Sequence, residues 1–188
     1  MSGVRIGSLW NALDCRQAAG LMAAGEAIGV FGRSVASIWI DATRQEAVDA
    51  VYRIKGAGRV GKPLGIALAK ADLPSLIDPE QIAPDLHRIF LNADDLAGRL
   101  NTLVWIRFPV RPSAASDLPE CLLSTTLDGV QWVQGWITDE GDAHGVLATR
   151  LAKNGIRLVA PTSMNVSGEP EVVAVEDGAA FCAEHGIG

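Results

Sequence analysis

Three cations and three glycines lie close together between Lys55 and Leu64. The cations are Lys55, Arg59 and Lys62, and the glycines are Gly56, Gly58 and Gly61. Glycine lets a backbone approach a ligand closely, and Lys or Arg side chains pair with phosphate or carboxylate oxygens. The segment is not a Walker A loop, because Lys62 is followed by Pro63 instead of Ser or Thr. From these residues alone, an anion-binding site and a flexible, solvated turn are equally good interpretations.

A second polar segment runs from Pro161 to Pro170 and reads Pro-Thr-Ser-Met-Asn-Val-Ser-Gly-Glu-Pro. It follows a predicted strand at 156–160, and ligands of open α/β sheets bind at such strand ends. The side chains of Ser163 and Asn165 can bond ribose hydroxyls, base edges or phosphate oxygens. The competing interpretation is a loop that uses Ser, Asn and Gly for turn geometry, and composition alone favours it.

Strands and helices alternate around these two segments. Thr43 and Glu46 have the spacing of a capping box, and apolar residues at helical spacing continue to about Lys55. Further helices are predicted at 14–24, 145–154 and 177–185, with short helices broken by prolines between 72 and 100. Strands are predicted at 27–31, 35–40, 64–68, 103–108, 130–137 and 156–160. This order favours a single α/β or α+β domain over residues 1–188, with one mixed sheet.

Charge is distributed unevenly along the chain, whose formal net charge is −6. Residues 1–111 carry 13 basic and 11 acidic groups, whereas residues 112–188 carry 3 basic and 11 acidic groups. The acidic balance argues against bulk binding of nucleic acid. Three widely spaced cysteines and the absence of an apolar run of membrane length predict a reduced, cytoplasmic protein without a membrane partner. Trp132 and Trp136 share one strand face, which predicts a core or homodimer contact in preference to a base-stacking platform.

Together, the two polar segments resemble motifs of the YrdC-like superfamily, which includes the threonylcarbamoyl-AMP synthases. Thr162 to Pro170 resembles its C-terminal signature, Thr-Ser-x-Asn-x-Ser-Gly-Glu-Pro. The helix end at Lys55, followed by Lys62-Pro63-Leu64, resembles its Lys-x-Arg-Pro-x-x-Lys-Pro-Leu segment. The resemblance covers about residues 17–171. It implies a twisted mixed sheet with flanking helices around a concave, cationic site.

The resemblance also implies a chemistry. Typical members use ATP, bicarbonate and threonine to make threonylcarbamoyl-adenylate and pyrophosphate, for modification of adenosine in tRNA. ATP would then be a substrate, with or without Mg²⁺, and no protein-bound metal is expected. Lys55, Arg59 and Lys62 would bind phosphates, while Ser163 and Asn165 would hold the nucleotide. Partners implied by the family are a nucleotide and tRNA or double-stranded RNA.

The N-terminal signature of the family is poorly kept. It falls on residues 31–39, where Arg33 replaces an acid and Trp39 replaces a glycine. Arg33 and Ser34 remain candidates for a substrate pocket, and the indole of Trp39 is expected to fill space there. The predicted strand at 130–137 also lacks the arginine that the family usually has. Two hypotheses follow: a nucleotide-dependent synthase, or a catalytically degenerate module that binds a nucleotide, double-stranded RNA or a protein.

Overall fold

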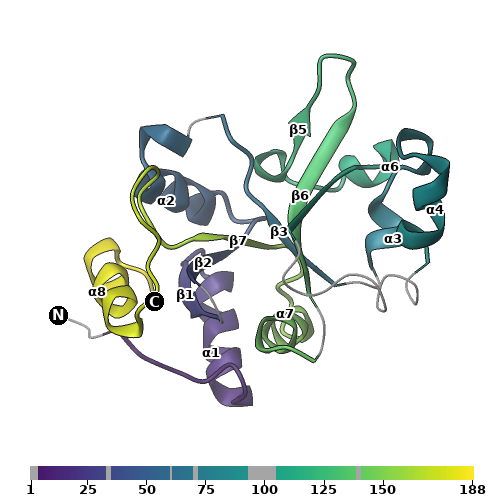
Figure 1. Ribbon diagram of the computed structural model, residues 1–188. Coiled ribbons are helices and arrows are strands. Elements are labelled where there is room, and N and C mark those ends of the chain that lie inside the picture. The colour runs from purple at the N-terminus through teal and green to yellow at the C-terminus, as the bar shows by residue number, and fades with distance from the viewer. Residues whose placement is uncertain (1–3, 33–34, 60, 70–71, 93–104, 139–140) are drawn as a thin grey trace.

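The computed structural model describes residues 4–32, 35–59, 61–69, 72–92, 105–138 and 141–188. Two small sheets form its centre (Figure 1). The first contains β1 (Ile28–Phe31), β2 (Ala36–Asp41) and β7 (Val159–Ser163), all antiparallel. The second contains β3 (Ile66–Ala69), β6 (Gln131–Thr138) and β4 (Trp105–Pro109), with the short β5 (Ser124–Thr125) also paired to β6. In this sheet β3 runs parallel to β6, and β4 and β5 run antiparallel to it.

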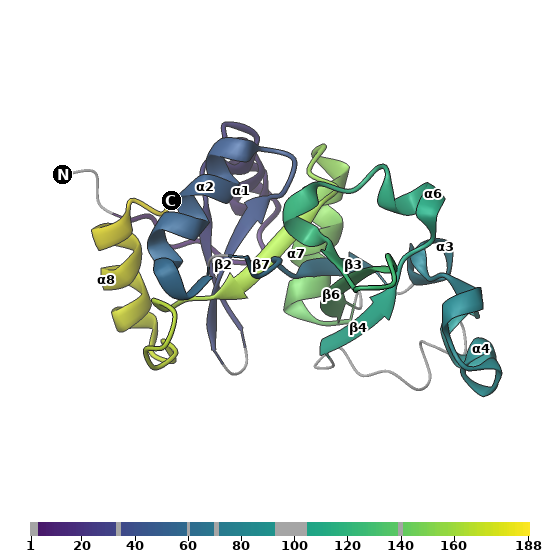
Figure 2. The same cartoon turned by 90° about the horizontal axis from the view of Figure 1, so that it is seen from above.

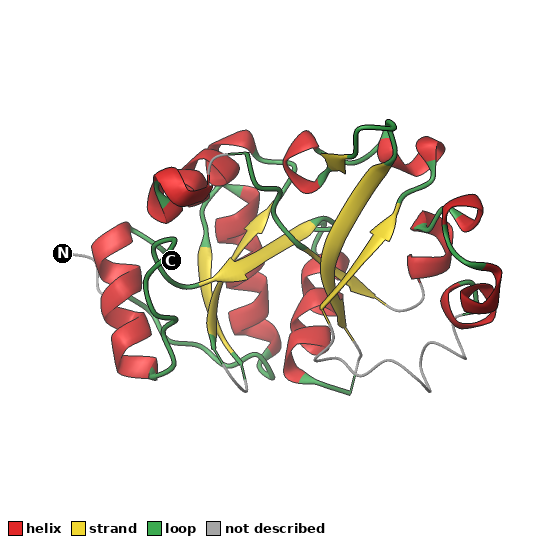
Figure 3. Cartoon of the chain, turned by 45° about the horizontal axis from the view of Figure 1, so that its top comes forward, coloured by secondary structure: helices red, strands yellow, loops and turns green. Residues whose placement is uncertain are grey.

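Helices cover the sheets from both sides. α1 (Ala12–Ala23) and α7 (Ala143–Lys153) pack against each other below the sheets in Figure 1, and α2 (Gln45–Lys55) lies above them. α8 (Val175–His185) contacts β1. The short helices α3 (Leu73–Leu76), α4 (Pro84–Phe90) and α6 (Pro112–Ala115) gather at the far end of the second sheet (Figure 3). Each has proline in its first turn, where a missing N–H costs no helical hydrogen bond.

The two sheets meet where β3 contacts β7. Seen from above, β7 lies between β1 and β2 on one side and β3, β6 and β4 on the other (Figure 2). The strand β2 is buried on both faces. Ile38 and Ile40 join the core beneath α2, whereas Trp39 joins a second core beneath α1 and α7. Strand β7 pairs with β2 and is buried from Val159 to Thr162, which fixes the position of Ser163 at its end.

The mixed α/β class and most predicted elements are confirmed, with three corrections. The predicted single mixed sheet is two smaller sheets. The strand predicted at 156–160 begins at Val159 and includes Pro161, Thr162 and Ser163, so the polar motif starts on a strand and not after it. The capping box is wrong, because Arg44 is the N-cap and makes no side-chain cap. The Thr43 hydroxyl donates instead to Asp41 Oδ1 at 2.7 Å.

Two further sequence-based expectations concern residues 93–104 and membrane-spanning helices. The helical segment predicted over 93–100 and the start of the strand predicted at 103 fall outside the described residues. Among the helices that are described, none is long and apolar enough to cross a membrane.

Candidate functional site

Lys55 is the last residue of α2, and its side chain reaches the end of β7. The helix ends there because Gly56 takes a positive φ of 68°, which favours glycine. The Lys55 ammonium donates to the Ser163 carbonyl oxygen at 2.7 Å, to Ser163 Oγ at 3.2 Å and to Asn165 Oδ1 at 2.6 Å. An ammonium has three N–H donors, so these bonds occupy all of them. The two polar segments of the sequence thus meet at this one lysine.

Further hydrogen bonds fix the loop that follows β7 around Lys55. Ser163 Oγ donates to Asn165 Oδ1 at 2.8 Å, and Asn165 Nδ2 donates to the Glu169 carbonyl oxygen at 2.7 Å. The Ser167 N–H donates to the Lys55 carbonyl oxygen at 3.1 Å. Ser163 and Asn165 are therefore held rigidly, and Lys55 is part of the framework that holds them.

Burial makes the charge of Lys55 costly. The residue is 3% exposed, and burial lowers the pKa of its ammonium from 10.5 to about 8. The positive charge of Arg59 lowers this pKa further, and the carboxylate of Glu171 opposes the change by raising it. Lys55 therefore responds to the electrostatic state of Arg59 and Glu171, both of which line the adjacent cavity.

That cavity has a volume of about 320 Å³ and takes its walls from both sheets. β7 contributes Pro161, Thr162 and Ser163, and β4 and β6 contribute Trp105, Gln134 and Trp136. The remaining lining residues are Val35, Arg59, Gly65 and Glu171. Of these described residues, Arg59 supplies a positive charge and Glu171 a negative one. The size and the mixture of aromatic walls with a few polar groups suit a small organic ligand.

Arg59 is positioned to pair with an anion. It ends the 3₁₀ helix Ala57–Arg59, and its Nη2 donates to the Pro63 carbonyl oxygen at 2.6 Å. Gln134 Nε2 donates to the same oxygen at 3.3 Å, which places these two side chains together. Arg59 Nε is buried and has no hydrogen-bond partner among the described residues. Burial lowers the pKa of this guanidinium, so an anion in the cavity that Arg59 lines would stabilise a charge that is poorly solvated.

Two tryptophans form a corner of the cavity. The rings of Trp105 and Trp136 meet edge to face, 5.7 Å apart at 88°. The ring of His144 also packs against Trp136, and their ring centroids are 5.5 Å apart. Gly65 allows the approach of Trp105, since a Cβ at this position would lie 2.1 Å from the indole Cη2. Both indoles therefore have fixed positions beside Arg59 and Ser163 in the lining.

Comparisons with known proteins find relatives by structure only. No family model matches the sequence, and no curated protein matches it. Among solved structures, P. abyssi Sua5 matches as a variant and in complex with L-threonine, with 21% identity in both cases and TM-scores of 0.64 and 0.61. These matches cover 93% and 94% of this chain, which spans about half of the Sua5 chain (47% and 45%). E. coli YciO matches with 12% identity and a TM-score of 0.59, over 85% of this chain and 67% of YciO.

A third kind of match is full-length HypF in a phosphate- and nucleotide-bound form, at 17% identity and a TM-score of 0.60. It covers 90% of this chain and 23% of HypF. The chain has the YrdC-like fold. The two motifs that resembled this family therefore indicated its fold correctly, although sequence identity to these structures is low.

Within this YrdC-like fold, the predicted site residues separate into three groups. Lys55, Ser163 and Asn165 form one hydrogen-bonded cluster, and Ser163 and Arg59 line the cavity. Lys62 is exposed and is not among the residues that line the cavity. Arg33 and Ser34, the predicted substrate-pocket residues, lie outside the described residues. The binding roles of all these residues stay predictions.

The expectation that Trp39 would fill the substrate pocket is wrong. Trp39 is fully buried in the core beneath α1 and α7, where it stacks on His144 at 5.7 Å. Its Nε1 donates to Ser37 Oγ at 2.9 Å. Side chains alternate along a strand, so Trp39 points away from the face that holds Ile38 and Ile40. The indoles that do line the cavity are Trp105 and Trp136.

The pairing of Trp105 with Trp136 explains why sequence reasoning missed this corner. Trp136 is opposite Trp105 in the antiparallel ladder between β4 and β6. The pairing joins residues that are far apart in the sequence, so no local spacing reveals it. The signal in the sequence that could have revealed this corner is Trp105, near the start of the strand predicted at 103–108. Trp132 instead pairs with Pro109 and has the Arg107 guanidinium 5.7 Å from its ring centre.

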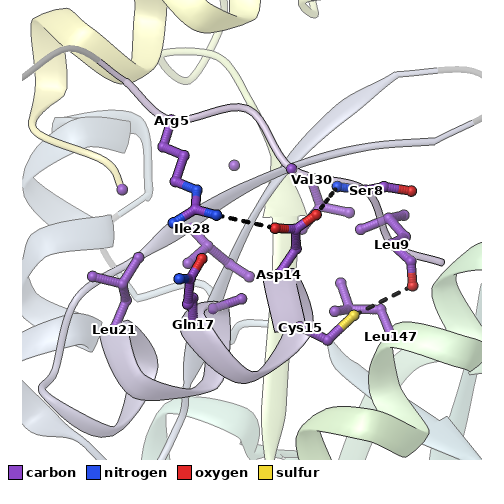
Figure 4. A pocket seen from close by; sticks show the side chains of 14 residues that line it. Arg5, Ser8, Leu9, Asp14, Cys15, Gln17, Leu21, Ile28, Val30 and Leu147 are labelled. Atoms are coloured by element: carbon purple, nitrogen blue, oxygen red, sulfur yellow. Dashed lines mark hydrogen bonds and ion pairs between the residues drawn. The ribbon is translucent and has the colours of Figure 1, made fainter. Parts of the chain in front are cut away.

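A second cavity, of about 110 Å³, lies between the N-terminal segment, α1 and β1 (Figure 4). Its floor is apolar and includes Leu21, Ile28 and Val30. Its charged groups already satisfy each other, because Arg5 pairs with Asp14 at 3.2 Å. Asp14 also accepts from the Ser8 N–H at 2.9 Å. This cavity contains none of the residues of the two polar motifs, so the cavity beside Arg59 is the better candidate site.

Proposed function

We propose that the protein is a YrdC-like nucleotide-binding module without synthase activity. In this proposal the cavity beside Arg59 holds the nucleotide, with Arg59 at a phosphate and with Thr162 and Ser163 as hydrogen-bonding groups. The nucleotide-bound form of HypF, which shares the fold, supports the choice of ligand class. The place of Arg59 in the cavity lining, as a positive charge among the described lining residues, supports its role as the anion partner.

The observation that carries the proposal is the small amount of available positive charge among the described residues that line the cavity. Lys55 already donates all three of its protons to Ser163 and Asn165, and Lys62 does not line the cavity. Among the described lining residues, the charge of Arg59 is opposed by that of Glu171. Formation of an adenylate requires positive charge that is already in place when pyrophosphate leaves. The cavity is better suited to hold a nucleotide than to break its phosphoanhydride bond.

The second candidate is a threonylcarbamoyl-AMP synthase that acts on ATP, threonine and bicarbonate. Its support is the meeting of Lys55 with Ser163 and Asn165, which are the matched motif positions, in a fold shared with Sua5 in complex with L-threonine. In this alternative the Lys55 ammonium would exchange a protein acceptor for a phosphate oxygen.

Two assays on the same protein preparation separate these candidates. Calorimetry with AMP and with ATP measures binding, and pyrophosphate release in the presence of ATP, L-threonine and bicarbonate measures synthesis. We expect the protein to bind AMP or ATP at micromolar concentrations. Its pyrophosphate release should not exceed that of an Arg59→Gln variant. Pyrophosphate release that depends on threonine and is lost in Arg59→Gln would establish the synthase. Failure to bind any nucleotide would reject both candidates.

A further inference from the structure

The charges of the described lining residues limit how many phosphates the cavity can hold. A single phosphate group carries a charge of about −1.5 to −2 at pH 7, and each additional phosphate of a nucleotide adds further negative charge. In the described lining, Arg59 is the group that offsets this charge, whereas Glu171 repels it. The Lys55 ammonium contributes a nearby charge, but its donors are already bonded to Ser163 and Asn165.

The two indoles of the cavity lining suit a flat, uncharged ring system. The perpendicular indoles of Trp105 and Trp136 present a face and an edge in one corner, and nucleobases stack on aromatic side chains regardless of base identity. Trp105 is 43% exposed and lines the cavity, so part of its indole is accessible to an incoming ring. Trp136 is held in place between Trp105 and His144.

We infer that the cavity selects nucleoside monophosphates over triphosphates, with the base on Trp105 and Trp136 and the phosphate at Arg59. The inference rests on the proposed nucleotide-binding function and adds its substrate class. Glu171 acts as the discriminating residue, because its carboxylate repels the additional charge of a longer phosphate chain. Stacking of the base and the preference for one phosphate both follow from a described lining that combines two indoles with one positive and one negative side chain.

The test compares the dissociation constants of AMP, ADP and ATP, measured by calorimetry with and without Mg²⁺. We expect AMP to bind at least tenfold more tightly than ATP. Glu171→Gln should tighten ATP binding about fivefold or more and leave AMP within about threefold. Glu169→Gln is the matched control, because Glu169 is an exposed carboxylate of the same loop and does not line the cavity. It should change neither constant.

The role of the indoles is tested with ribose 5-phosphate, which has the phosphate and lacks the base. Trp105→Leu should weaken AMP binding tenfold or more and ribose 5-phosphate binding less than twofold. Trp10→Leu, which removes an exposed indole outside the cavity lining, should change neither. At saturating concentrations, AMP should also quench tryptophan fluorescence more strongly in the wild type than in Trp105→Leu, which keeps only Trp136 beside the base. Each variant is first checked for the wild-type circular dichroism spectrum.

The outcomes separate this inference from the function on which it rests. If ATP, alone or with Mg²⁺, binds as tightly as AMP, the selectivity is refuted while nucleotide binding stands. If Glu171→Gln changes AMP and ATP equally, Glu171 is not the discriminating residue and the inference fails. If Trp105→Leu weakens ribose 5-phosphate as much as AMP, the base does not stack on Trp105. If no nucleotide binds to the folded wild type, the proposed function and the inference fall together.

Discussion

Raising the pH from 8 to 10.5 is expected to stabilise the fold through Lys55. The pKa of this ammonium is 10.5 ordinarily and about 8 in the folded protein. Between these values the unfolded chain binds more protons at this group than the folded chain, so the free energy of unfolding rises with pH. At ~1.4 kcal/mol per pKa unit, the lowering from 10.5 to about 8 corresponds to about 3 kcal/mol. Below pH 8 this contribution is constant, because Lys55 is protonated in both states.

The assay is urea unfolding of the wild type and of Lys55→Met at a series of pH values from 7 to 10.5. The difference between the two free energies isolates Lys55, since both proteins carry the other titrating groups. It should be constant up to about pH 8 and then move by about 3 kcal/mol in favour of the wild type. A flat difference, or one that moves against the wild type, would refute the reasoning.

A direct titration keeps this prediction testable even if Lys55→Met does not fold. The chain has four lysines, Lys55, Lys62, Lys70 and Lys153. In protein labelled with ¹³C on lysine, the Lys55 Cε resonance should titrate with a midpoint near 8. A midpoint for Lys55 near the ordinary value would show that its ammonium is not buried among Ser163, Asn165 and the nearby Arg59.

Three other perturbations test separate parts of the structure. Arg59→Gln should weaken AMP binding by about 10- to 100-fold in calorimetry, as expected for the loss of a charge-assisted hydrogen bond of roughly 1.5–3 kcal/mol. The control is Arg53→Gln, which changes an exposed arginine. Equal effects of the two substitutions would show that Arg59 is not part of the site. Asn165→Ala should lower the free energy of urea unfolding by about 2–3 kcal/mol, because it removes an acceptor from the buried Lys55 ammonium. A loss below about 0.5 kcal/mol would contradict the hydrogen-bonded cluster of Lys55, Ser163 and Asn165. Gly65→Ala should shift the tryptophan emission and lower the melting temperature, because its Cβ would collide with the Trp105 ring. The control Gly20→Ala has open space on α1 and should raise the melting temperature slightly, and a Gly65→Ala protein that behaves like it would contradict the position of Trp105.

The fold followed from the sequence where signals are local. Apolar runs and helical periodicity predicted most of the strands and helices, and the order of two motifs identified the YrdC-like fold that the solved structures share. The capping box failed because Asp41, at the end of β2, accepts the Thr43 hydroxyl and competes for it. The strand that begins at Val159 was predicted too early, because pairing with β2 sets its limits and the sequence around Ile156 does not reveal that pairing.

The candidate site was predictable only in part, for the same physical reason. Lys55, Ser163 and Asn165 were identified from motif spacing, and the structure brings them together. Trp105 and Glu171 were not identified, because their roles depend on which elements face the cavity. Trp39 was misplaced because the motif comparison assigned it a position without the alternation of side chains along β2, which turns its indole into the other core.

The central claim is that a nucleotide occupies the cavity between Arg59 and the end of β7. The most direct measurement is a crystal structure of the wild-type protein with AMP. We predict that the phosphate lies within hydrogen-bond distance of the Arg59 guanidinium, with the base against the indoles of Trp105 and Trp136. Electron density for AMP at another place, such as the cavity beneath Arg5, or a phosphate remote from Arg59 would contradict it.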